Sequence, residues 1–286
     1  MTQSSAGLIS GVLLFLVASG LTLTFGVLGF VNFFHGSFYM IGAYFAYTAY
    51  VLTGSFVAAV LAGAIGVAIV GFILERVLIK RIYGAEVLLQ ILVCYALILI
   101  FDDLVRYIWG PEFISLGMPE AFRVRPWFIF GGVVPPFYVF LIATTLAITT
   151  GLIIVLRYTR YGKIIRAAAQ NRNMVAALGI NTDLVYVSVF TLGALLAGAA
   201  GALAAPVRSL TSGMGFSVLI ESFIVTVIGG MGSVYGAFVA AILIGLTRSF
   251  GSMGFPLFTE GLIFIFMALI LLLRPQGLFG HPEREI

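Results

Sequence analysis

The most constraining feature of this 286-residue sequence is a long stretch without charged side chains. From Met1 to Leu74 there is no lysine, arginine, aspartate or glutamate. A helix spans the hydrocarbon core of a bilayer with only about 20 apolar residues, so this stretch is long enough for three spans. The chain is 62% hydrophobic and has a mean hydropathy of +1.17. A soluble domain of this composition would expose more apolar surface than water tolerates, so we expect lipid to be the solvent.

The chain contains few residues that carry enzyme chemistry. It has one cysteine, Cys94, and two histidines, His35 and His281. One cysteine excludes an intrachain disulfide and a thiolate metal cluster, and Cys94 is predicted to pack in an apolar run. The phosphate-binding pattern G-x-x-x-x-G-K-[ST] and the zinc pattern H-E-x-x-H are both absent. We therefore expect no enzyme activity, no cofactor or metal bound by this chain, and no nucleic acid partner.

The charge-poor runs predict an all-α integral membrane protein with about eight transmembrane helices in one domain over residues 1–286. An open sheet leaves unsatisfied backbone groups in lipid, and the short alternating segments of a barrel are absent. The first run continues to Phe30 after an uncharged start, which favours a retained span over a cleaved signal peptide. The predicted spans are 7–28, 37–53, 56–74, 87–105, 136–156, 184–205, 218–250 in broken form, and 258–273.

The basic residues predict the orientation of these spans. The segment "ERVLIKR" at 75–81 and the segment 157–183 are rich in arginine and lysine, so both are predicted to be cytoplasmic. The loop 106–135 between them, which mixes both charge signs with turn formers, is predicted to be external. One crossing by 218–250 would leave Arg274 outside, whereas two short helices there would return it to the cytoplasm. Both alternatives stay open.

Two glycine-containing interruptions divide apolar runs. "VNFFHGSFYMIGAY" and "VIGGMGSVYGAF" both resume with G-S-x-Y, which indicates a possible internal pseudo-repeat with broken helices. Irregular backbone at membrane depth must be buried in protein or line a cavity, so we predict a translocation pathway here. Alternatively, these are tight helix connections, with polar side chains capping the following helix. The predicted pathway residues are Asn32, His35, Gly36, Ser37, Tyr39, Gly229, Gly230, Gly232 and Ser233.

Two further patterns bear on packing and on energy coupling. Gly193, Ala197, Gly201 and Ala205 recur every four residues, which predicts a face for close helix contact. An ion-coupled carrier usually keeps ionisable groups near the bilayer centre. Here the acids Asp102, Asp103, Glu221 and Glu260 lie near the ends of apolar runs, and Glu221 is the nearest to an exception. We therefore expect the driving energy to enter from another subunit.

The order "GLTLTFGVLGFVNFFHGSFYMIGAY", "YGKIIRAAAQNRNMVAALGINTD", "GGMGSVYGAFVAA" and "LLLRPQGLFG" resembles the permeases of high-affinity branched-chain amino acid ABC importers, specifically the LivH-type subunit. This resemblance implies a permease of the bacterial inner membrane. It also implies as partners a second, LivM-like permease chain, two ATPase subunits that hold ATP and Mg, and a periplasmic binding protein. The implied cytoplasmic coupling segment lies within 157–183, and its implied core is Gly162, Lys163, Arg166, Ala167, Asn171, Ala176 and Gly179.

A simpler interpretation of the basic residues in 157–183 is contact with lipid head groups, which explains the charges but not the alanines and glycines. The resemblance implies leucine, isoleucine and valine as the first choice of cargo. Related importers take urea, short amides or aromatic carboxylates, and these stay as alternatives. A stand-alone channel or ion-coupled carrier is the alternative from another class.

Overall fold

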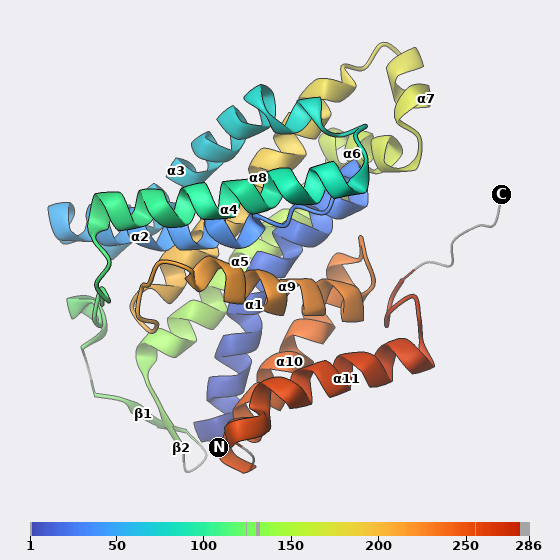
Figure 1. Ribbon diagram of the computed structural model, residues 1–286. Helices are drawn as coiled ribbons and strands as arrows, with labels where there is room; N and C mark the ends of the chain where they lie inside the picture. The colour runs from blue at the N-terminus through green and yellow to red at the C-terminus, as the bar shows by residue number, and fades with distance from the viewer. Residues whose placement is uncertain (1, 124, 130–131, 255, 281–286) are drawn as a thin grey trace.

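The computed structural model describes residues 2–123, 125–129, 132–254 and 256–280. The described part of the chain is a helical bundle with one short hairpin, as Figure 1 shows. The α-helices are α1 (Thr2–Leu28), α2 (His35–Thr53), α3 (Phe56–Val77), α4 (Val87–Trp109), α5 (Pro136–Tyr158), α6 (Arg160–Gln170), α7 (Arg172–Ala177), α8 (Thr182–Ala204), α9 (Met214–Gly229), α10 (Val234–Gly254) and α11 (Thr259–Leu273). Three single 3₁₀ turns are η1 (Ile79–Arg81), η2 (Glu120–Phe122) and η3 (Pro256–Phe258).

The predicted external loop 106–135 contains the two strands of the hairpin. Strand β1 (Trp127–Ile129) pairs antiparallel with β2 (Gly132–Val134), and Trp127 lies opposite Val134. The all-α prediction is confirmed for the membrane bundle, and this hairpin is an addition to it. Residues 124 and 130–131 of the loop and the tail 281–286 belong to the predicted domain but lie outside the described residues.

Seven of the predicted spans each coincide with one α-helix, and the broken span 218–250 coincides with two. Six of the described helices are long and apolar enough to cross a membrane: α1, α3, α4, α5, α8 and α10. The apolar helices α9 and α11 are shorter. The chain is therefore a multi-pass membrane protein.

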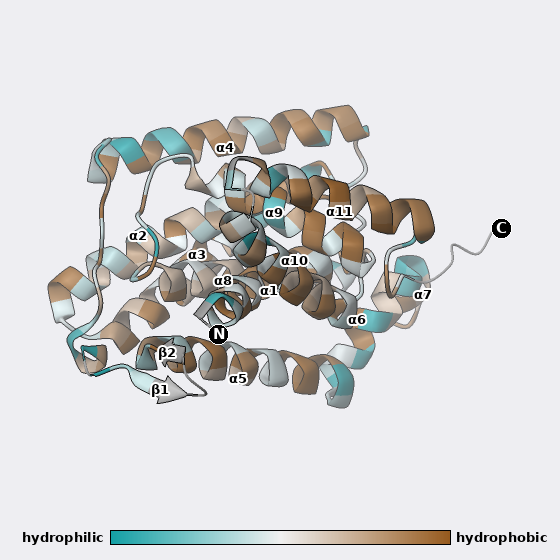
Figure 2. Ribbon diagram, turned by 90° about the horizontal axis from the view of Figure 1, so that it is seen from below, coloured by the Kyte–Doolittle hydropathy of each residue, from teal (hydrophilic) through white to brown (hydrophobic). Residues whose placement is uncertain are grey.

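The bundle has two distinct ends. Helices α6 and α7 lie at one end, and the hairpin lies at the opposite end in both views (Figures 1 and 2). We call these the α6–α7 end and the hairpin end. The two ends differ in their charged and apolar side chains.

The predicted broken span 218–250 forms two helices, α9 and α10, that turn back on each other. A Cβ at Gly229 would lie 2.4 Å from the carbonyl carbon of Gly236, so the two backbones almost touch at the turn. Arg157, at the end of α5, donates to the Tyr235 hydroxyl at the start of α10 (3.3 Å), which places this turn beside the α6–α7 end. The backbone N–H of Leu278 donates to the Ile228 carbonyl (2.8 Å), so the segment after Arg274 also lies there. This arrangement agrees with the two-helix alternative for 218–250.

Helix α8 packs at the centre of the bundle through small residues. A Cβ at Gly193 would lie 3.1 Å from the Gly20 carbonyl oxygen in α1, and a Cβ at Gly201 would lie 2.0 Å from the Tyr39 carbonyl oxygen in α2. The predicted contact face of α8 is therefore confirmed. Small residues let helices approach closely, and van der Waals contact then holds them together in lipid. Figure 2 shows α4 and α5 on opposite flanks of this core.

We predict that Gly42→Ala destabilises the bundle. A Cβ at Gly42 would lie 2.5 Å from both Cα and the carbonyl oxygen of Gly198 in α8, so one backbone must shift. Overpacking of this kind costs about 1–3 kcal/mol. The thermal unfolding midpoint of the detergent-solubilised protein should fall by several degrees. The control is Gly151→Ala in α5, where a Cβ meets nothing within 4 Å. Equal midpoints for the two variants would contradict the prediction.

Candidate functional site

The first set of predicted pathway residues lies where the chain re-enters the bundle. Helix α1 ends at Leu28, Gly29 has a φ of +62°, and α2 begins at His35. The His35 ring atom Nε2 lies 3.1 Å from the carbonyl oxygen of Val17, near the middle of α1. Asn32 and His35 are both fully buried. The N-terminus of α2 therefore lies inside the bundle, at about half the length of α1.

Several polar atoms at this junction lack hydrogen-bond partners in the described part of the chain. They are Nδ2 and Oδ1 of Asn32, Nδ1 of His35 and Oγ of Ser37. The N-cap residue of α2 is Phe34, and no side chain caps the helix. The alternative in which Asn32, His35 and Ser37 cap α2 is therefore wrong, because none of these side chains makes a capping hydrogen bond to the helix. Buried polar groups without partners are costly and rare, so they mark a place with a role beyond packing.

A second helix begins at the same place. A Cβ at Gly36 would lie 1.9 Å from the carbonyl oxygen of Gly215, in the first turn of α9. The rings of Phe33 and Phe223 stack with their centroids 6.1 Å apart. The N-terminal ends of α2 and α9 therefore meet within the bundle. Such ends carry partial positive charge and unpaired N–H groups, and in transporters they face anionic substrate groups.

The second set of predicted pathway residues lies elsewhere, in the α9–α10 turn. A Cβ at Gly230 would lie 2.4 Å from the backbone nitrogen of Gly280, and the Phe279 N–H donates to the Gly229 carbonyl (3.1 Å). Ser233 Oγ accepts from the Gly236 N–H (3.1 Å). A Cβ at Gly26 would lie 2.9 Å from Cα of Gly232. These residues form a tight helix connection under the C-terminal segment, which is the alternative interpretation of this glycine cluster. The structure does not bring them to the α2–α9 junction.

A group of charged side chains lies between α2, α9 and α10. The Arg248 guanidinium forms a short ion pair with the Glu221 carboxylate. Arg208, in the loop before α9, hydrogen bonds to the Tyr39 hydroxyl and lies near Glu221. Sequence reasoning singled out Glu221 and Tyr39 but missed both arginines. For Arg248 the available signal was one acid and one base, Glu221 and Arg248, inside the same predicted span 218–250. Arg208 lies outside this span and carried no such signal.

The predicted coupling segment forms two short helices, α6 and α7. The buried side of α6 includes Ile165 and Ala168, and the buried side of α7 includes Val175. The side chain of Asn171 caps α7 by accepting from the Met174 N–H (2.9 Å). Six of the seven predicted coupling residues are exposed, and these are Lys163, Arg166, Ala167, Asn171, Ala176 and Gly179.

Two of the coupling residues also have packing roles. Gly162 is buried, and a Cβ there would lie 2.1 Å from the carbonyl oxygen of Leu156, so glycine is needed for the turn from α5 into α6. The Arg166 guanidinium donates to the same Leu156 carbonyl. Sequence reasoning missed Met174 and Leu178, which are apolar yet 61% and 73% exposed. The sequence feature that could have identified Met174 and Leu178 is their apolar side chains in an otherwise polar segment.

An ion cluster anchors the coupling segment to the bundle. The Asp183 carboxylate in α8 accepts from Lys80 Nζ (2.6 Å) and from Arg172 Nη2 (3.0 Å). The Arg172 guanidinium also lies over the Tyr186 ring, 4.6 Å from its centroid. One carboxylate therefore ties η1, α7 and α8 together at the α6–α7 end.

The bundle, with six described helices long and apolar enough to cross a membrane, defines the class of this protein as a multi-pass integral membrane protein. The sequence profile of the family described as "Branched-chain amino acid transport system / permease component" matches residues 4–273. The chain belongs to this family.

Two relatives match nearly the whole chain, and a third matches about half of it. The high-affinity branched-chain amino acid transport system permease protein BraD of Pseudomonas aeruginosa is 29% identical, over 100% of this chain and 97% of its own. The corresponding protein LivH of Escherichia coli K12 is 29% identical, over 94% of this chain and 92% of its own. LivM of the same organism is 27% identical over 52% of this chain and 36% of its own.

One solved structure has a similar fold. PsaBC from Streptococcus pneumoniae in complex with Fab superimposes with a TM-score of 0.52 at 13% sequence identity. The superposition covers 94% of this chain and 89% of that chain. At this identity the likeness concerns the fold alone.

We predict that Asp183→Asn loosens the coupling segment without unfolding the bundle. The variant keeps the size of the side chain but loses both ion pairs, which are partly exposed and are worth about 0–1 kcal/mol in total. Backbone amides of residues 172–181 should exchange hydrogen about two to five times faster, as measured by mass spectrometry. The control is Asp103→Asn, which removes an ion pair with Arg106 (3.7 Å). Exchange as slow as in the parent would show that Asp183 does not anchor α7.

Proposed function

We propose that this chain is the membrane-spanning subunit of an ABC importer that translocates branched-chain, hydrophobic amino acids. The observation that carries the proposal is the family match over residues 4–273. The similarity to BraD and LivH over nearly the whole chain supports the same cargo. The weaker, partial similarity to LivM supports a second, related permease chain as the partner in a heterodimer.

In this proposal the α6–α7 end faces the cytoplasm and contacts two separate ATPase subunits, which hold ATP and Mg. The exposed surface formed by Lys163, Ala167, Met174 and Leu178 supports this role, because it combines basic groups with apolar side chains that water disfavours. The hairpin end then faces a periplasmic protein that delivers the substrate. Closing of the ATPases would be transmitted through α6, α7 and the Asp183 ion cluster to α8.

The test is reconstitution of the permease with its partner chains in liposomes. ATP-dependent uptake of leucine, isoleucine or valine is the expected result. Uptake of urea, short amides or aromatic carboxylates in their place would assign one of the alternative cargoes. Solute flux through the chain without ATPase subunits would instead indicate a channel or an ion-coupled carrier, and the proposal would be wrong.

We predict that Ala167→Trp and Leu178→Asp each reduce ATPase association. Both side chains are exposed, so the substitutions should leave the bundle intact while a bulky ring or a buried charge obstructs docking. Co-purification of the ATPases should fall at least about tenfold, since truncating or blocking a central interface residue costs about 2 kcal/mol or more. Gly179 is a poorer target because its φ of +81° strains any other residue.

The matched control is Ala121→Trp, an exposed alanine at the hairpin end, which should leave co-purification unchanged. Substrate-stimulated ATP turnover in liposomes provides the second measurement. If the α6–α7 variants assemble and transport like the parent, the segment is a lipid-facing topology signal.

We predict that a cysteine at Ser37 becomes accessible only during transport. Ser37 is 1% exposed, so in this conformation a small water-soluble thiol reagent cannot reach it. In a background in which Cys94 is replaced by alanine, Ser37→Cys should react during ATP-driven turnover and stay protected without ATP. Leu178→Cys should react in both conditions and Ala200→Cys in neither, because they are exposed and buried respectively. Protection of Ser37→Cys in both conditions would show that the start of α2 is not part of the translocation pathway.

A further inference from the structure

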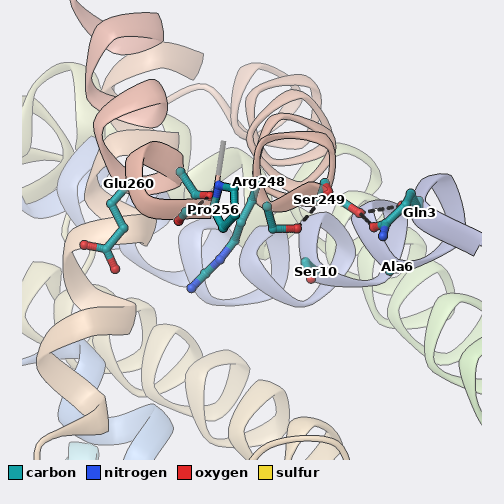
Figure 3. Close-up of a pocket in the computed structure, with 9 residues that line it drawn as sticks. Gln3, Ala6, Ser10, Arg248, Ser249, Pro256 and Glu260 are labelled. Carbon is teal, nitrogen blue, oxygen red and sulfur yellow. Dashed lines mark hydrogen bonds between the residues drawn. The ribbon is translucent and has the colours of Figure 1, made fainter. Parts of the chain in front are cut away.

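A polar cavity opens at the hairpin end, away from the α2–α9 junction. It is bordered by the first turns of α1, the last turns of α10 and the start of α11, and its volume is about 470 Å³. Figure 3 shows Arg248 and Glu260 reaching it from different helices. Ser249, on the same wall, donates to the backbone carbonyl of Gln3 (2.6 Å) and so ties α10 to α1. The volume falls in the range of small-molecule sites, but the polar lining suits a charged head group better than an apolar side chain.

Arg248 is the one basic residue among those that line this cavity in the described part of the chain. Arg248 pairs with Glu221 through Nη1, and Arg208 also lies near Glu221. The ion pair uses one nitrogen of the Arg248 guanidinium. A guanidinium has five N–H donors, and the Arg248 side chain remains 34% exposed. Arg248 thus keeps donors for a second anion, and a fork of this kind matches a carboxylate or a phosphate.

Glu260 supplies the opposite charge on another wall of the cavity. It lies in the first turn of α11 and is exposed. Within the described ranges, no salt bridge joins it to a basic residue. An exposed carboxylate beside a bound anion is suited to an ammonium group. The cavity therefore offers one group for an anion and one for an ammonium, held on separate helices.

We propose that this cavity binds a compact zwitterion, with its anionic group on Arg248 and its ammonium group on Glu260. Two sources share this chemistry: the head group of an α-amino acid and the head group of phosphatidylethanolamine. The amino acid source rests on the proposed function and makes the cavity an outer binding site for the cargo. The lipid source is independent of the cargo.

The first arm of the test measures ligand binding by the purified importer complex in nanodiscs, without the binding protein. The ligands are leucine, 4-methylpentanoate, which lacks the ammonium, and 3-methylbutylamine, which lacks the carboxylate. Glu260→Gln should weaken leucine binding about tenfold, as expected for loss of a charge-assisted contact, and leave 4-methylpentanoate unchanged. Arg248→Gln should weaken leucine and 4-methylpentanoate but leave the amine unchanged. Glu120→Gln and Arg106→Gln, at the same end but outside the cavity, are the matched controls.

The second arm measures lipid retention by native mass spectrometry. Reduced retention of phosphatidylethanolamine, but not of phosphatidylglycerol, in the Glu260→Gln variant would assign the site to lipid. Glu260→Gln breaks no described ion pair, and Arg248→Lys keeps the charge beside Glu221, so folding can be checked separately.

The outcomes of the two arms decide the proposal. A ligand-selective loss of leucine binding or of phosphatidylethanolamine retention supports it, whereas parent-like behaviour of both cavity variants in both arms overturns it. Failure of the proposed function is seen elsewhere, as an absence of ATP-dependent leucine uptake by the parent complex. The lipid arm then still tests the zwitterion site.

Discussion

The fold depends on direct contact between helix backbones. Lipid gives no hydrophobic drive for one apolar helix to bind another, so the helices are held by van der Waals contact at short range. Glycines allow the helix backbones to come this close. A Cβ at Gly42 would lie 2.5 Å from Cα of Gly198, and a Cβ at Gly201 would lie 2.0 Å from the Tyr39 carbonyl oxygen. Helix α8 can therefore pack against α1, α2 and α3 at once. Without this core, α2 could not begin inside the bundle.

The same packing makes the irregular backbone around Asn32 possible. Unpaired backbone in lipid costs several kcal/mol per group, and it is tolerated only when protein surrounds it. Phe34 and Met40 are fully buried on either side of His35, and the Gly36–Gly215 contact brings the start of α9 against the start of α2. The result is a buried polar point inside the bundle. In a transport subunit, such a point offers hydrogen-bond partners to a polar solute inside the bundle.

The two ends of the bundle carry different arrangements of charged side chains. At the α6–α7 end, Asp183 holds Lys80 and Arg172 and leaves apolar Met174 and Leu178 exposed. At the hairpin end, the Arg248–Glu221 pair lies at a polar cavity instead. The first arrangement suits docking of a protein, and the second suits a small charged head group. The buried helices that join the two ends provide a rigid connection between them.

The sequence by itself determined the solvent, the helical class, the positions of the helices, the family and the exposure of the 157–183 segment. The solvent and the helices follow from local properties, namely the absence of charge from Met1 to Leu74 and the runs of apolar residues. The family follows from the resemblance of four sequence segments to known permeases, and the exposure of 157–183 from its basic residues. Whether 218–250 turns back on itself, and where Gly229–Ser233 lies relative to Asn32, was decided only by the tertiary structure. The same holds for the pairing of Arg248 with Glu221 and for the buried polar atoms of Asn32 that have no partner in the described chain. Each of these depends on distances between segments far apart in the sequence, and such distances are set by how the helices pack.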